Sequence, residues 1–237
     1  MGIVFFTVAI LPTIGSGDQK LFSAESTGLK IGKLHPKIST TARWMWSLYL
    51  IMTIACTTAY HLGGMDMFDA INHAFSTVAT GGFSTHQASM AYFNSPTIEY
   101  ISIAFMFLAS INFTLLYLFV IKFRFREVLK DAELRFFTCT VLLSTVFVAG
   151  TLIVAHEENF SGAIRNALFN VVSISSTTGF TTNDFMMWHP CVWMVITMIG
   201  VMGACAGSTS GGLKSIRVLT AYKISLCEFR RTLHPKA

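Results

Sequence analysis

Charged residues are scarce in this chain. Asp, Glu, Lys and Arg together make up 12% of its 237 residues, whereas apolar side chains make up 53%. Because soluble domains carry about twice that share of charge, the composition excludes an ordinary soluble globular protein and predicts an integral membrane protein. We attribute the isoelectric point of about 9.0 to the orientation of the chain in a membrane, and we expect no nucleic-acid partner.

Metal-binding and nucleophilic motifs are also missing. The five cysteines form no CxxC pair, and no two histidines have the i, i+4 spacing that places two ligands on one helix face. We therefore expect small buried thiols and no metal centre. An intramembrane enzyme using Ser208 and Ser210 is a competing hypothesis, but no GxSxG elbow surrounds them, so we expect no enzymatic activity. Solvated or interfacial positions are expected for the outer histidines: His61, His73, His86, His156 and His189.

Long apolar runs divide the chain. They cover residues 3–14, 44–62, 97–121, 134–155 and 190–202, and the last run resumes at 213–226 after a polar break. At about 1.5 Å per residue, the three middle runs are long enough to cross, or nearly cross, a hydrocarbon core about 30 Å thick as single helices. The first run is short, and we expect it to be the end of a helix that begins before Met1. Asn112 is expected mid-helix, facing the bundle interior or a pore.

Basic residues mark one side of these helices. If each long run crosses once, all of the 17 Lys and Arg residues except Arg165 fall on the same side, which the positive-inside rule identifies as cytoplasmic. Asp and Glu divide evenly between the two sides, so the outer face is acidic and attracts cations. We expect membrane lipid as a partner, and we expect Arg165 to reach toward the outer headgroups.

A short sequence occurs twice, in the connections between these runs. STVATGGFSTH, Ser76 to His86, aligns without a gap to SISSTTGFTTN, Ser173 to Asn183, at an offset of 97 residues. Each copy follows a segment that predicts a short helix. Irregular backbone at membrane depth must be buried in protein or line a wet cavity, and glycine lets carbonyl oxygens turn toward one point.

We therefore predict a pair of cation-binding loops, each at the negative C-terminal end of a short re-entrant helix. The alternative is that the Ser and Thr side chains only cap and pack helices.

Together with GACAGSTSGGLKSIR near the C-terminus and AILPTIGSGDQKLFSAESTG near the N-terminus, the two copies resemble the Trk/Ktr/HKT superfamily of potassium transporters, and closely its bacterial Trk-type membrane subunit. The resemblance implies an all-α integral membrane fold in which four M1-P-M2 repeats (helix, re-entrant pore helix with filter loop, helix) surround one pore.

The same resemblance divides the chain into segments. Residues 1–15 would end the last helix of a preceding repeat, 16–43 and 122–133 would be cytoplasmic connections, and 227–237 a cytoplasmic tail. One repeat would occupy 44–121 with its pore loop at 63–96. The next would occupy 134–226, with its pore loop at 156–189 and an intramembrane break at 203–212.

The family's selectivity filter, carried over by position, falls on two sets of residues: Thr80, Gly81, Gly82 and Phe83, and Thr177, Thr178, Gly179 and Phe180. K⁺ would bind at the carbonyl oxygens of Thr80, Gly81, Thr177 and Thr178. In many relatives a glycine at the positions of Gly82 and Gly179 accompanies preference for potassium. The resemblance thus implies K⁺ as the transported ion, with no organic cofactor in this chain.

Four glycines interrupt the last apolar run between residues 203 and 212. Each glycine inside a helix costs about 1 kcal/mol relative to alanine, so we expect an unwound segment. The resemblance implies a gating loop that obstructs the pore, made of Gly203, Gly207, Ser208, Thr209, Ser210, Gly211 and Gly212, with Lys214 at its cytoplasmic end. The alternative is a face of small residues that lets helices approach closely.

The resemblance also implies partners and a location. It implies a homodimer of complete chains in the bacterial cytoplasmic (inner) membrane, controlled by a cytoplasmic nucleotide-binding regulatory ring subunit. The chain itself has no nucleotide-binding motif. Since the sequence contains two filter loops and a ring needs four, a non-conducting fragment or accessory membrane subunit stands as the alternative function.

Overall fold

The computed structural model describes residues 38–155 and 159–233, with side chains from Arg43 onward. The expected helix end at 1–15, the connection up to residue 37, and the end of the tail after residue 233 lie outside these residues. The described part is built from helices and contains no strand. Its α-helices are α3 (Ile38–Leu62), α4 (Met67–Val78), α5 (Pro96–Ala109), α6 (Phe113–Val120), α7 (Phe125–Lys130), α8 (Ala132–Val154), α9 (Phe160–Ser175), α10 (Pro190–Met202) and α11 (Ser215–Leu233).

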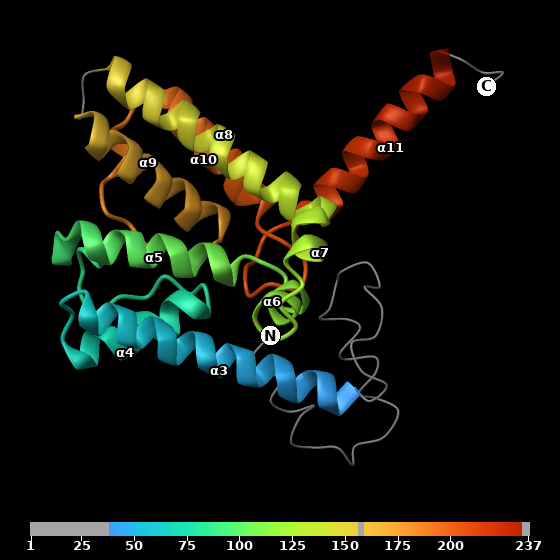
Figure 1. Cartoon of the computed structure of the whole chain (residues 1–237). Helices are drawn as coiled ribbons and strands as arrows, with labels where there is room; N and C mark the ends of the chain where they lie inside the picture. The colour runs from blue at the N-terminus through green and yellow to red at the C-terminus, as the bar shows by residue number, and fades with distance from the viewer. Residues whose placement is uncertain (1–37, 156–158, 234–237) are drawn as a thin grey trace.

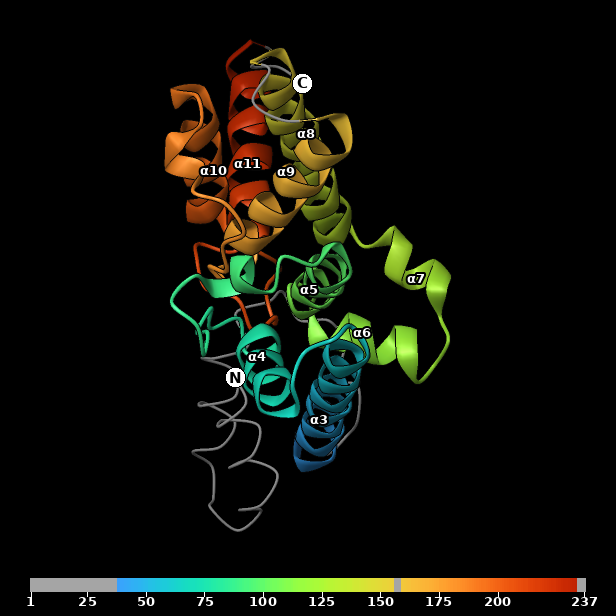
Figure 2. The ribbon, with the colours of Figure 1, turned by 90° about the vertical axis from the view of Figure 1, so that its left-hand side faces the viewer.

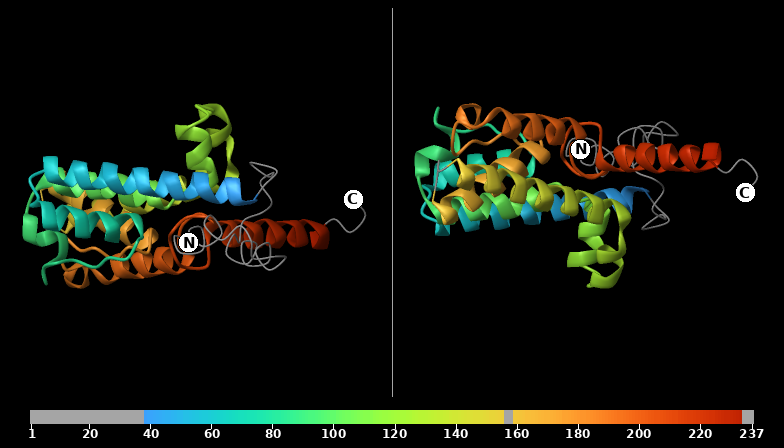
Figure 3. Two further views of the ribbon diagram at one scale, coloured as in Figure 1. Left: turned by 90° about the horizontal axis from the view of Figure 1, so that it is seen from below. Right: turned by 90° about the horizontal axis from the view of Figure 1, so that it is seen from above.

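Most of these helices lie side by side in one bundle (Figure 1). Helix α5 lies between a lower pair, α3 and α4, and an upper group, α8, α9 and α10, as a second view also shows (Figure 2). Its contacts with α4 on one side and α9 on the other join the two halves of the chain. Helix α7 projects sideways from the bundle, and α11 extends beyond its end (Figure 3).

Local signals in the sequence set where several helices begin. Asp66 and Asp131 precede α4 and α8, and their carboxylates accept hydrogen bonds from the backbone N–H groups of Phe68 and Leu134. Pro96 and Pro190 lie in the first turn of α5 and α10. Proline is tolerated there because the N–H groups of the first turn have no acceptor within the helix. The short helices α4 and α9 end in the repeated Thr/Gly sequences.

Helix α8 is the clearest candidate for a membrane span. Within the described residues it is the single helix of sufficient length and mean hydropathy to cross a membrane, and the count rises to two if the bent pair α5 and α6 is one span. Leu143 and Val146 of α8 are exposed, as expected for a face that contacts lipid. The run 44–62 forms part of the 25-residue helix α3, which does not meet the same hydropathy criterion, and α10 is apolar but only 13 residues long.

The run 97–121 is not one straight helix, and the expectation that Asn112 lies mid-helix is wrong. Helices α5 and α6 meet at an angle of 108° across the break between Ala109 and Phe113. Asn112 is the N-cap of α6, and its side-chain oxygen accepts a hydrogen bond of 2.8 Å from the Thr114 N–H. The side chain of an asparagine can bond nearby backbone groups in place of the helical backbone hydrogen bonds. One helix therefore ends and another begins within a run that is apolar throughout.

Arg165 does not extend toward headgroups, contrary to the sequence-based expectation. Its Nε lies 2.7 Å from Oε2 of Glu99, and the side chains are 27% and 9% exposed. The two atoms form a contact ion pair, although the N–H is not aligned for a hydrogen bond. Because Glu99 belongs to α5 and Arg165 to α9, the pair links the two halves of the bundle.

Candidate functional site

The two copies of the repeated sequence fold into similar turns. After α4, the N–H of Thr80 donates to the Thr77 carbonyl at 3.1 Å, and the N–H of Gly81 donates to the Ser76 carbonyl at 2.7 Å. The same two bonds recur 97 residues later, from Thr177 to Ile174 at 3.0 Å and from Thr178 to Ser173 at 2.9 Å. After the role that the sequence analysis predicts for them, we call residues 79–83 the first filter loop and residues 176–180 the second filter loop.

Backbone dihedral angles repeat as well. Thr80 and Thr177 have positive φ of 52° and 57°, and Gly82 and Gly179 have φ of 70° and 86°. A non-glycine residue with positive φ is uncommon, so its occurrence at both equivalent threonines shows that the two turns share a specific conformation.

The two filter loops are in contact with each other. A Cβ atom on Gly82 would lie 1.9 Å from the Thr178 carbonyl oxygen, so only glycine fits at that position. Beyond the loops, the N–H of Ala91 donates to the Thr181 carbonyl at 3.3 Å. The structure therefore places Gly82 of the first loop against Thr178 and Gly179 of the second, so the two copies of the repeated sequence meet in space.

The two loops differ in how their aromatic residue is placed. Phe180 is fully buried, and its carbonyl oxygen accepts a hydrogen bond of 2.6 Å from the Ser173 hydroxyl. Phe83, at the equivalent position, is 82% exposed. The Phe180 ring lies against His73 of α4, with ring centroids 5.9 Å apart, so the second loop contacts the other half of the bundle, whereas Phe83 is exposed.

Residues Gly203 to Lys214, which we call the inner loop, are irregular and connect α10 to α11. Gly203, Gly207 and Gly212 have φ of 67°, 75° and 78°. Close approach of the chain to itself adds a second constraint, because a Cβ on Gly203 would meet the Gly211 carbonyl oxygen at 2.6 Å. Lys214 donates to the Ser210 carbonyl oxygen through its ammonium group.

The inner loop contacts both filter loops through threonine hydroxyls. The Thr80 hydroxyl donates to the Thr209 carbonyl at 3.0 Å, a bond it shares with the carbonyl of its own neighbour Ala79 at 2.7 Å. The Thr177 hydroxyl accepts from the Gly211 N–H at 2.6 Å. Equivalent threonines of the two loops are therefore both tied to the segment that the sequence analysis named as a gate.

The inner loop also occupies the break between α5 and α6. The Thr209 hydroxyl donates to the Ala109 carbonyl at 3.1 Å, and the N–H of Phe113 donates to the Gly207 carbonyl at 3.0 Å. A Cβ on Gly207 would lie 3.0 Å from the Asn112 side-chain oxygen. Backbone groups at the break between α5 and α6 thus form hydrogen bonds with the inner loop, as buried backbone groups require.

Glu133 anchors the inner loop at both ends, a role that the sequence analysis missed. Its side chain is buried, and Oε1 accepts hydrogen bonds from the N–H of Ala206 at 2.6 Å and of Ile216 at 3.2 Å. A carboxylate that accepts backbone N–H bonds makes strong, charge-assisted hydrogen bonds. The one sequence signal was an acidic residue in the first turn of a long apolar helix.

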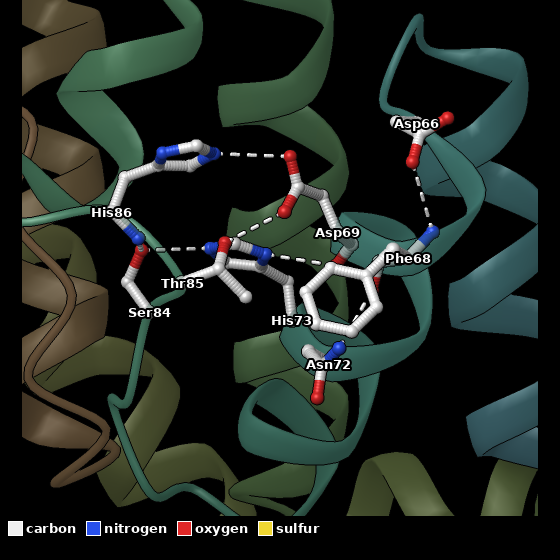
Figure 4. A network of polar contacts seen from close by, with 8 residues as sticks. All are labelled: Asp66, Phe68, Asp69, Asn72, His73, Ser84, Thr85 and His86. Atoms are coloured by element: carbon white, nitrogen blue, oxygen red, sulfur yellow. Dashed lines mark hydrogen bonds and ion pairs between the residues drawn. The ribbon is translucent and has the colours of Figure 1, made fainter.

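Above the first filter loop, a polar network joins α4 to the segment that leaves the loop (Figure 4). Asp69 accepts from the Thr85 hydroxyl at 2.7 Å and from Nε2 of His86 at 3.0 Å. These bonds, first from Thr85 and then from His86, lower the pKa of the Asp69 carboxyl. His73 is fully buried, so the expectation of a solvated or interfacial histidine is wrong for this residue.

Side chains suited to a tightly bound metal do not gather in the described part of the chain, where no group of three or more His, Cys, Asp or Glu could hold an ion. Cys56 and Cys205 are buried thiols, while Cys139, Cys191 and Cys227 are exposed, and all five are free. The expectation of buried thiols therefore holds for two of the five.

Comparison with known proteins matches the whole chain, residues 1–237, to the TrkH family, described as cation transport proteins. The chain belongs to the TrkH family. It is 40% identical to the Trk system potassium uptake protein TrkH of Escherichia coli (strain K12) over 241 residues, which cover 100% of this chain and 50% of that protein. It is 36% identical to TrkG of the same strain, covering 100% and 49%.

A solved structure agrees with this family assignment. The crystal structure of the potassium transporter TrkH from Vibrio parahaemolyticus superposes with a TM-score of 0.82 at 39% identity, over 100% of this chain and 48% of that one. The chain therefore spans about half the length of the TrkH family relatives it matches. These relatives are transport proteins of membranes, which agrees with the all-helical membrane fold and the absence of enzymatic activity expected from the sequence.

Proposed function

We propose that this chain contributes two of the filter loops of a potassium uptake protein of the cytoplasmic membrane. The observation that carries the proposal is the pair of filter loops with the same hydrogen bonds and the same positive φ angles, in contact with each other and both bonded to the inner loop. Potassium uptake is the activity named for the relatives. The carbonyl oxygens of Thr80, Gly81, Thr177 and Thr178 would replace water around a dehydrated K⁺.

The proposed architecture assigns α3, α4 and the bent pair α5 and α6 to one M1-P-M2 repeat. Helices α8, α9 and α10, with the inner loop and α11, would form the next. In each, a short helix ends at the filter loop and directs its negative end toward the ion. A long helix, a short helix, a Thr/Gly turn and an interrupted helix follow one another in this order twice along the chain, and this repetition supports the assignment.

The inner loop would be the gate. Its position against Thr80 and Thr177 supports this role, because a loop bonded to the filter threonines blocks the inner end of the ion path. Opening would require breaking these bonds together with the ones to Glu133. We further propose, from the family membership, that complete chains form homodimers and that a cytoplasmic nucleotide-binding ring subunit controls the gate.

Ion uptake by the full-length product of the gene that encodes this chain tests the proposal. Rb⁺ uptake, with and without competing Na⁺, would be measured in a bacterial strain that lacks other potassium uptake. The variants Gly82→Asp and Gly179→Asp should abolish uptake or remove its preference for Rb⁺ at unchanged surface amount. Gly64→Asp is the matched control, since Gly64 also has positive φ, 106°, but lies in open space outside the filter loops.

Unaltered Rb⁺ over Na⁺ preference in both filter variants would refute the assignment. The competing function, a non-conducting accessory subunit, predicts that no variant affects uptake because the chain carries none. Sizing of the complex under native conditions, alongside flux, separates these cases.

A further inference from the structure

The first filter loop is held from outside by a set of four side chains, which we call the outer strap: Asp69, Ser84, Thr85 and His86. The carboxylate of Asp69, in the first turn of α4, receives the Thr85 hydroxyl at 2.7 Å and His86 Nε2 at 3.0 Å. Figure 4 shows these bonds spanning from α4 to the chain that leaves the loop after Phe83. The strap therefore fixes the outer end of the loop to the start of the helix that precedes it.

His73 completes the connection one turn further along α4. Its Nδ1 lies 2.8 Å from the Asp69 carbonyl oxygen, and its Nε2 lies 2.9 Å from the Ser84 hydroxyl. Since a carbonyl only accepts, Nδ1 carries the proton, and a neutral ring then accepts from Ser84 at Nε2. The Ser84 oxygen in turn accepts from the His86 N–H at 3.1 Å, so every bond in the series has a donor and an acceptor.

The second filter loop provides an internal comparison. At the offset of 97, Asp69 corresponds to Asn166, His73 to Asn170, and His86 to Asn183. The helical bond is kept, because Asn170 Nδ2 donates to the Asn166 carbonyl at 2.9 Å as His73 Nδ1 does to Asp69. The second copy has no carboxylate at the position of Asp69. Thr182, which corresponds to Thr85, has a buried hydroxyl without a hydrogen-bond partner.

The two loops are therefore held in different ways. The second has its phenylalanine buried and its carbonyl bonded to Ser173, whereas the first has its phenylalanine 82% exposed. The outer strap holds the first loop through side-chain hydrogen bonds, and Asp69 is its centre because it accepts two of them.

We propose that Asp69 is a positioning residue for ion selection: through Thr85 and His86 it holds the first filter loop in the geometry that distinguishes K⁺ from Na⁺. The inference rests on the proposed function of the filter loops. It assigns to Asp69 no direct contact with the ion.

Selectivity of the full-length gene product in the same Rb⁺ uptake assay tests this role. Asp69→Ala removes both acceptors, and we expect the Rb⁺ over Na⁺ preference to fall by about tenfold or more, as for the loss of hydrogen bonds to a charged group. The KM for Rb⁺ should rise at unchanged surface amount. Asp69→Asn keeps an oxygen for Thr85 and should retain most of the preference.

Asp66→Asn is the matched control. Asp66 is an acidic residue of the same helix start, but its carboxylate accepts from the Phe68 N–H, and asparagine serves equally well as an N-cap. Losses in both Asp66→Asn and Asp69→Asn as large as the loss in Asp69→Ala would overturn the proposal, because they would show that negative charge at the outer face, and not positioning, is responsible. Wild-type selectivity in Asp69→Ala would overturn it too.

If Asp69→Ala fails to reach the membrane, Thr85→Val provides the second test. The Thr85 side chain is exposed, so its loss should leave folding intact while lowering selectivity about threefold, as expected for one hydrogen bond; unchanged selectivity would refute the role. Failure of the filter assignment itself is distinguishable. If the filter assignment is wrong, Gly82→Asp also leaves the Rb⁺ over Na⁺ preference unchanged. If Gly82→Asp changes the preference and Asp69→Ala does not, only the inference about Asp69 is contradicted.

Discussion

Substitution of the two filter glycines by alanine should have unequal effects, although sequence treats them as equivalent. Both residues have positive φ, 70° at Gly82 and 86° at Gly179, and holding alanine in the left-handed region costs about 1–2 kcal/mol. At Gly82 the new Cβ would also lie 1.9 Å from the Thr178 carbonyl oxygen, whereas nothing lies within 4 Å of a Cβ on Gly179.

Relief of that overlap requires the two filter loops to move apart, for which overpacking costs of about 1–3 kcal/mol are typical. We therefore expect Gly82→Ala to destabilise the protein by about 2–5 kcal/mol and Gly179→Ala by about 1–2 kcal/mol. Selectivity should follow the same order, because the atom displaced at Gly82 is a carbonyl oxygen assigned to the ion.

The measurements are the midpoint of thermal unfolding of the purified full-length protein in detergent and the Rb⁺ over Na⁺ preference in cells. Gly64→Ala reports the cost of positive φ alone, since Gly64 has φ of 106° and no neighbour within 4 Å. Gly179→Ala should resemble that control in thermal stability. A Gly179→Ala protein that is as unstable as Gly82→Ala, or more so, would show that contact between the loops does not determine the cost.

Three further predictions concern contacts between segments distant in sequence. Glu133→Ala removes the acceptor of the buried Ala206 N–H and of the partly buried Ile216 N–H, at about 1–3 kcal/mol for the buried group. The inner loop should therefore loosen and basal Rb⁺ flux should rise, whereas Glu133→Gln keeps an oxygen and should not change basal flux. Thr177→Val removes the acceptor of the Gly211 N–H and should raise basal flux, whereas Thr177→Ser should not; equal flux in both variants would contradict a gate held by this bond. Arg165→Ala removes the ion pair with the buried Glu99 carboxylate and should lower the free energy of unfolding by about 3 kcal/mol. Adding Glu99→Gln to Arg165→Ala should recover part of this loss, and a double variant no more stable than the single one would contradict the pairing.

Helix positions were predictable where short-range signals exist. Asp131 caps α8 and Pro190 opens α10, and these residues act within one turn of the helix. The repeated sequence also predicted two similar turns, because a glycine with free φ after a short helix restricts the local backbone in the same way twice. The bend at Asn112 was not predicted, since apolar residues continue on both sides and hydropathy does not register a side chain that caps the next helix.

The roles of Glu133, Asp69 and His73 depended on contacts that no local pattern encodes. Glu133 lies 73 positions from Ala206 along the chain, and nothing in the sequence near either residue indicates the other. Outer-side histidines were expected in solvent or at the interface, but the folding of the segment after the first filter loop back over α4 buries His73 and bonds it to Ser84. Similarly, Arg165 meets Glu99 because α5 packs on α9.

The sequence by itself determined the membrane class, the helical fold, the family and the repeated Thr/Gly loops, because composition, hydropathy and glycine placement act over a few neighbouring residues. The tertiary structure alone decided how the inner loop is held: between the threonines of both filter loops, in the break between α5 and α6, and on the carboxylate of Glu133. Those partners are up to 129 positions apart. Buried backbone N–H and C=O groups need hydrogen-bond partners, and here tertiary packing supplies partners that are far apart in the sequence.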